Sequence, residues 1–121
     1  MKTPAPPLGG LAVEDFMRRH WQRRPRLIRN ALPGFVPPVA PADLFALAAG
    51  DEVESRLISG NGRRWRLEHG PFEPGRLPLA ARRNWTLLVQ GMDLHDDAVN
   101  ALMSRFRFVA DARLDDLMIS Y

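Results

Sequence analysis

The sequence predicts an α+β fold in which short amphipathic helices accompany a β-hairpin and further strands. Apolar residues recur at helical spacing in three segments, strand-length apolar runs lie between them, and turn residues separate the segments. The chain has 121 residues, of which 45% are hydrophobic. A chain of this size can build one core, and two independent domains are excluded.

Composition excludes several classes of protein. The chain contains no cysteine, which excludes disulfide scaffolds, thiol nucleophiles and Cys-ligated metal sites. No apolar run approaches the roughly 18 residues that a membrane span requires, and the amino terminus has no apolar signal region. We therefore expect a cytoplasmic protein without membrane contact. The 17 basic and 14 acidic residues give a net charge of +3, so the placement of charges matters more than their sum.

The amino-terminal third is expected to contain two helices joined by irregular chain. Residues 1–10 are rich in proline and glycine and predict a flexible lead-in, so the structured part is residues 11–121. Residues 11–21 show helical spacing, and Pro25 prevents that helix from continuing. A brief strand at residues 26–29 and a proline-rich connector at residues 32–41 follow. Pro41 suits the first turn of a second helix, which Gly50 ends.

The middle of the chain predicts strands and a third helix. Residues 53–59 and 64–68 are expected to form a β-hairpin, because Gly60-Asn61-Gly62 tolerates positive φ. Residues 85–90 form an apolar run that predicts a strand buried on both faces. Asp96 and Asp97 can cap a helix whose apolar residues fall at i, i+3, i+4 and i+7. Those apolar residues are Val99, Leu102, Met103 and Phe106.

The final segment, residues 114–121, predicts a strand with unusual polar residues. Alternation places Asp116, Met118 and Ser120 on one face, and Asp115 with Leu117, Ile119 and Tyr121 on the other. Adjacent carboxylates disfavour a strand, and a carboxylate that points inward requires a cation. Two interpretations stay open: Asp115 is exposed while Asp116 pairs with an arginine, or one of the two binds a ligand. An apolar strand rarely ends a domain, so we expect the sequence to continue beyond Tyr121.

The histidines do not predict a metal site. His95 and Asp97 have the His-x-Asp spacing of an iron triad, but Asp96 and Asp97 fit the start of a helix better. His20 and His69 belong to other elements. Phosphate loops and nucleophile elbows are also absent from the sequence, so we assign no catalytic residue and no metal ligand.

An arginine-rich segment follows the first predicted helix. Six arginines occur within twelve residues that contain no acid, interleaved with His20 and Trp21. They are Arg18, Arg19, Arg23, Arg24, Arg26 and Arg29. Contact with phosphate or RNA is one interpretation, and solvation of a helix end is the other.

Six groups of residues, in order and with similar spacing, resemble the bacterial ribosomal oxygenases over residues 14–121. They are His20-Trp21-Gln22 with Arg24-Pro25; Glu54-Ser55-Arg56-Leu57; His69-Gly70-Pro71-Phe72; Asn84-Trp85 with Leu87-Leu88-Val89-Gln90; Leu102-Met103 with Phe106-Arg107; and Asp115-Asp116-Leu117-Met118-Ile119-Ser120. These enzymes are JmjC/cupin-type hydroxylases that depend on Fe(II) and 2-oxoglutarate. The bacterial branch hydroxylates an arginine of a large-subunit ribosomal protein.

The resemblance implies that the chain is the amino-terminal entry region and first core strand of a cupin-type jelly roll, truncated before the iron motif. Fe(II) and 2-oxoglutarate would then belong to the parent protein, with no metal ligand matched in this chain. Asp115, Asp116, Met118 and Ser120 would orient the substrate arginine. The implied partner is a ribosomal protein. Contact with ribosomal RNA through Arg18, Arg19, Arg23 and Arg24 is also allowed. The parent protein could be a homodimer. The alternative function is a non-enzymatic, arginine-rich module that binds RNA or ribosomes.

Overall fold

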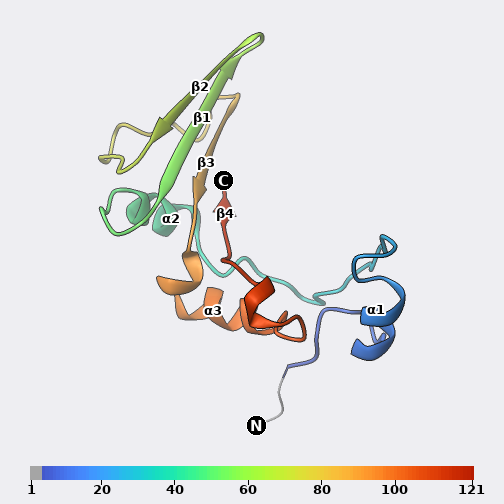
Figure 1. Cartoon of the computed structure of the whole chain (residues 1–121). Helices are drawn as coiled ribbons and strands as arrows, with labels where there is room; N and C mark the ends of the chain where they lie inside the picture. The colour runs from blue at the N-terminus through green and yellow to red at the C-terminus, as the bar shows by residue number, and fades with distance from the viewer. Residues whose placement is uncertain (1–3) are drawn as a thin grey trace.

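A computed structural model describes residues 4–121 as three helices beside one antiparallel sheet (Figure 1). The helices are α1 (Val13–Arg19), α2 (Pro41–Ala48) and α3 (Asp97–Ser104). The strands are β1 (Ser55–Asn61), β2 (Arg64–His69), β3 (Trp85–Val89) and β4 (Ile119–Ser120), in the order β2-β1-β3-β4. Single 3-10 turns, η1 (Met92–Leu94) and η2 (Asp111–Arg113), flank α3. The expected α+β class is confirmed.

The hairpin of β1 and β2 forms where the sequence predicts it, with a turn two residues later. Asn61 pairs with Arg64, which leaves Gly62 and Arg63 as the loop. Gly62 has φ +77°, a conformation that glycine adopts without steric cost. Gly60 therefore lies inside β1, where it faces Trp65 across the hairpin.

The core lies between one face of the sheet and the helices α2 and α3. Leu57 of β1 pairs with Leu87 of β3, and Leu87 and Val89 are fully buried. Leu44 of α2 and Val99 of α3 pack into the same cluster. Pro41 occupies the first turn of α2, as expected.

The opposite face of the sheet, which we call the open face, is much less covered. Trp65 and Leu67 of β2 lie on it with 73% and 54% of their surface exposed. Leu88 of β3 is half-buried there. The prediction that residues 85–90 are buried on both faces is therefore wrong, because only the alternate residues of β3 contact the core.

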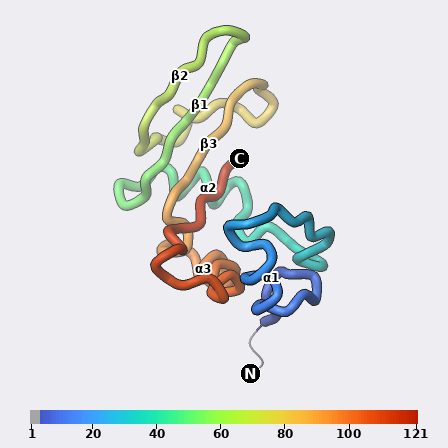
Figure 2. The backbone as a smooth tube through the Cα atoms, turned by 45° about the vertical axis from the view of Figure 1, so that its right-hand side comes forward, coloured from blue at the N-terminus to red at the C-terminus, as the bar shows by residue number. Residues whose placement is uncertain are grey.

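Helix α1 lies at the far end of the molecule from the hairpin tip (Figures 1 and 2). It is shorter than predicted and buries no residue, but Phe16 makes an edge-to-face contact with Phe108 at a ring-centroid distance of 5.8 Å. The expected strand at residues 26–29 is wrong. Its backbone pairs with none of the described strands, and Leu27 is 75% exposed.

The amino-terminal residues that the structure describes make defined contacts. Leu8 is buried, and the Arg105 guanidinium donates to the Ala5 carbonyl at 3.0 Å and 3.3 Å. Residues 1–3 of the expected flexible lead-in lie outside the described residues. Over residues 4–121, none of the helices has the length and apolar character needed to cross a membrane.

Candidate functional site

The site segment, residues 114–121, is fixed to the turn after β3 by three hydrogen bonds. Asp116 Oδ2 accepts from the Gly91 N–H at 2.7 Å. In return, the Asp93 carboxylate accepts from the Leu117 N–H at 3.0 Å, and the Met92 N–H donates to the Leu117 carbonyl at 3.0 Å. Gly91 has φ +62°, which turns the chain from β3 into η1. Two carboxylates therefore hold the two segments together reciprocally.

Strand β4 spans only Ile119 and Ser120, and Tyr121 continues the pairing through two backbone hydrogen bonds with Leu87, so the predicted strand over residues 114–121 is too long. The alternation is nevertheless present. Leu117 and Ile119 pack against the core, whereas Met118 and Ser120 are exposed. Ser120 pairs with Leu88, which places it on the open face. The side chains of Met118 and Ser120 thus lie away from the core.

Arg56 of β1 contacts the site segment from the same face. Its Nη2 donates to Met118 Sδ at 3.9 Å, and its Nε is buried without a hydrogen-bond partner. The sequence analysis missed Arg56, Asp93 and Gly91 as parts of the site. Asp93 and Leu117 are 24 residues apart, so no local pattern indicates their contact. Glycine between a strand and a helix is the one signal that marks this turn.

The two aspartates have different environments. Both side chains are exposed to solvent, and Asp116 is in addition hydrogen-bonded to the Gly91 amide. The ion pairs among residues 4–121 do not include Asp116, so the arginine partner considered from the sequence is replaced by a backbone amide. An ionised carboxylate has about four lone-pair positions. The Gly91 amide uses one, and the rest can accept from another donor.

The histidines lie in separate elements. Among the described residues, no group of three or more His, Cys, Asp or Glu side chains could hold a metal ion. Asp96 Oδ1 accepts from the Val99 N–H at 3.0 Å and caps α3, as the sequence predicts. These residues do not provide the ligand set of an iron site, and no chemical step through a metal is derived from them.

The arginine-rich segment surrounds a hollow of about 570 Å³ at the end of α1. The hollow is lined by Arg18, Arg19, His20, Arg23, Arg24 and Arg26. Arg18 is also paired with Asp15 at 2.6 Å. Arg29, which the sequence groups with these residues, does not line the hollow.

The arrangement of sheet, helices and site segment is similar to that in part of a solved ribosomal oxygenase. A structure of YcfD, a ribosomal oxygenase from Escherichia coli, in complex with cobalt and 2-oxoglutarate superimposes on 92% of this chain with a TM-score of 0.82 and 41% identity, and the match covers 30% of that protein. No family model matches the chain.

Two curated relatives specify the similarity further. The ribosomal protein uL16 3-hydroxylase of Escherichia coli K12 is 42% identical over 107 residues, which are 88% of this chain and 28% of that protein. The probable ribosomal oxygenase of Haemophilus influenzae is 31% identical over 112 residues, or 92% of this chain and 28% of that protein. The resemblance stated from the sequence is confirmed, and the non-enzymatic alternative is not favoured. The chain spans about 28% of the length of these relatives.

Proposed function

We propose that the chain is the amino-terminal part of an Fe(II)- and 2-oxoglutarate-dependent oxygenase that hydroxylates an arginine of a large-subunit ribosomal protein. The observation that carries this proposal is the combined agreement of sequence and fold. Identity is 42% over 107 residues with a protein named as a uL16 3-hydroxylase, and the fold matches a ribosomal oxygenase over 92% of the chain.

The proposed architecture is the entry region and first core strand of a cupin-type jelly roll. Strand β4 is the candidate core strand, because it lies at one edge of the sheet and pairs with β3 on one side only among the described strands. A further strand could pair with its free edge. The iron and 2-oxoglutarate ligands would then lie outside these 121 residues, in agreement with the separate positions of the three histidines.

The proposed role of the site segment is to orient the substrate arginine. Asp116, Met118 and Ser120 come from one short segment, and the Asp116 carboxylate retains acceptor positions after binding the Gly91 amide. A planar guanidinium donates well to such a carboxylate. Asp115 is the alternative partner, since it is exposed and its carboxylate is available. The hydrogen bonds that fix the segment to η1 would hold the carboxylate in place.

The proposed partners include ribosomal RNA as well as the ribosomal protein. Arg18, Arg19, Arg23 and Arg24 line one hollow, where the basic side chains could contact phosphates. A cytoplasmic location and a homodimeric parent stay predictions.

The activity is tested with the complete protein, Fe(II), 2-oxoglutarate and the purified large-subunit ribosomal protein. Mass spectrometry should find one added oxygen atom on an arginine, and omission of 2-oxoglutarate should abolish the addition. Failure to modify any arginine, with 2-oxoglutarate consumed at no more than the background rate, would contradict the proposed function.

A further inference from the structure

A second basic surface lies at the tip of the hairpin, at the opposite end of the molecule from α1 (Figures 1 and 2). We call it the tip groove. It has a volume of about 370 Å³ and is lined by Arg64, Trp65 and Arg66 of β2, Arg82 of the loop before β3, and Ser59, Gly60 and Asn61 of β1. Residues from three segments of the chain therefore form one polar surface.

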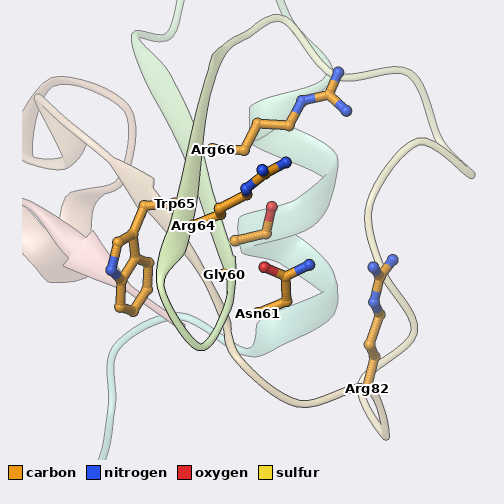
Figure 3. A pocket seen from close by; sticks show the side chains of 7 residues that line it. Gly60, Asn61, Arg64, Trp65, Arg66 and Arg82 are labelled. Atoms are coloured by element: carbon orange, nitrogen blue, oxygen red, sulfur yellow. The ribbon is translucent and has the colours of Figure 1, made fainter.

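The register of the hairpin explains why these side chains gather. Asn61 pairs with Arg64 and Ser59 with Arg66, so all four point to the same face of the sheet. Figure 3 shows Arg64, Arg66 and Arg82 on one side of the hairpin, with Trp65 directed to the other side.

Positive charge in the tip groove is only partly neutralised locally. Arg63 and Arg83 adjoin the lining arginines, and residues 59–66 and 79–84 contain no acid. Glu68 forms ion pairs with Arg66 at 3.2 Å and with Arg76 at 3.6 Å. Arg64 and Arg82 form no ion pair among residues 4–121. Five arginines thus accumulate in a chain whose total charge is only +3.

The chemistry of the lining fits phosphate groups. Guanidinium groups bind phosphate oxygens through paired donors, and the Asn61 amide and Ser59 hydroxyl can add further hydrogen bonds. The exposed arginines contact a ligand from one side, which suits an extended backbone. Because Trp65 points away from the arginines, base stacking is not part of this contact. Binding through phosphates alone carries little sequence preference.

We propose that the tip groove binds the phosphate backbone of RNA, as a contact distinct from the arginines at α1. The choice of RNA over another polyanion rests on the proposed function, in which the substrate is a ribosomal protein. The expectation that the groove binds phosphate groups follows from the residues that line it.

The test measures RNA affinity of the complete protein as a function of salt concentration, by fluorescence anisotropy with a labelled RNA hairpin of mixed sequence. The triple variant Arg64→Gln, Arg66→Gln and Arg82→Gln removes three charges from exposed positions. Its affinity should fall about tenfold or more at low salt, and the slope of log K against log salt should become shallower by roughly 2 to 3. A triple lysine variant keeps the charges and should retain most of the slope.

A control variant removes three charges elsewhere through Arg29→Gln, Arg107→Gln and Arg113→Gln. An equal loss in this control would show that net charge alone governs binding and would overturn the proposal. An unchanged slope in the tip-groove variant would overturn it as well. A polyglutamate peptide that competes with the RNA hairpin at equal charge concentration would assign the groove to acidic proteins instead.

Hydroxylation separates this proposal from the function on which it rests. The tip-groove variant should hydroxylate the isolated ribosomal protein at the parental rate, because its arginines belong to β2 and the loop before β3 and not to the site segment. Absence of hydroxylation in the parental protein would contradict the proposed function, and the salt dependence would still decide whether the groove binds RNA. A large fall in hydroxylation in the variant alone would overturn the separation of the two sites.

Discussion

Gly70, at the end of β2, lies directly against Ser55 at the start of β1. The Gly70 N–H donates to the Ser55 carbonyl at 2.8 Å, and Ser55 is 2% exposed. A Cβ atom at Gly70 would overlap Ser55 Oγ. Glycine is therefore required here by close packing, because a buried side chain in a closed strand pair has no room to move.

Gly70→Ala should destabilise the protein by about 1 to 3 kcal/mol, the usual cost of overpacking. The midpoint of thermal unfolding of the complete protein should fall accordingly. Gly50→Ala is the matched control, since its added Cβ would meet only the Leu47 carbonyl at 3.4 Å. A variant at Gly70 with parental stability would contradict the close packing described here.

Asp96→Ala should remove the cap of α3 and cost roughly 1 kcal/mol. The Val99 N–H loses its acceptor in this variant, and Val99 is a core residue. Asp97→Ala serves as a control, because Asp97 is exposed and lies within the helix. Urea unfolding should show a lower free energy of unfolding for Asp96→Ala than for Asp97→Ala. Equal stabilities of the two variants would argue against the cap.

At the scale of elements, the structure shows which local sequence signals are sufficient to predict a helix or a hairpin. Helix α3 combines a cap with apolar residues at helical spacing, and the hairpin combines two strand-like runs with a glycine turn, so both were predictable from local sequence. The run at residues 26–29 has the same apolar character, but pairs with no described strand. The hydrogen bond from Leu117 to Asp93 was not predictable, because it joins distant residues through the fold.

Asp93→Ala should loosen the site segment, since the Leu117 amide loses its acceptor while remaining half-buried. An unsatisfied amide of this kind costs about 1 to 3 kcal/mol. Hydrogen exchange at the Leu117 amide should accelerate. Asp93→Asn keeps an acceptor oxygen and should preserve most of the protection. Equal exchange in the alanine variant and the parent would show that this bond does not hold the segment.

For the molecule as a whole, the open face is one source of exposed apolar surface. Alternation in the sequence places Leu117, Ile119 and Tyr121 on one face of the final segment. In the structure Leu117 and Ile119 pack against the core, and Tyr121 contacts the rings of Phe45 and Trp85 at 5.1 Å and 5.3 Å. Trp65, Leu67 and Met118 are instead the exposed residues on the open face. In the proposed jelly roll, later strands would have to cover this surface.

The 121-residue chain on its own should therefore self-associate, because exposed apolar patches favour association. Light scattering should report species larger than a monomer. The double variant Trp65→Lys and Leu67→Lys should reduce association, whereas Leu79→Lys and Leu94→Lys, at two exposed positions away from the open face, should not. A monomeric parental chain with a single cooperative unfolding transition would contradict the prediction.

The central claim is that the site segment orients a substrate arginine through a carboxylate, and Asp116→Asn tests it most directly. Asparagine keeps an oxygen for the Gly91 amide and removes the charge. Loss of a charged hydrogen bond of about 1.5 to 3 kcal/mol should lower arginine hydroxylation by roughly tenfold or more.

The measurement is hydroxylation of the ribosomal protein by mass spectrometry, with 2-oxoglutarate turnover followed in parallel, for the complete protein carrying Asp116→Asn or Asp115→Asn. Asp116→Asn should lose hydroxylation while uncoupled 2-oxoglutarate turnover continues, and Asp115→Asn should retain more activity. Loss of hydroxylation in Asp115→Asn alone would assign the orientation of the substrate arginine to Asp115. Parental hydroxylation in both variants would contradict the claim that either carboxylate holds the substrate.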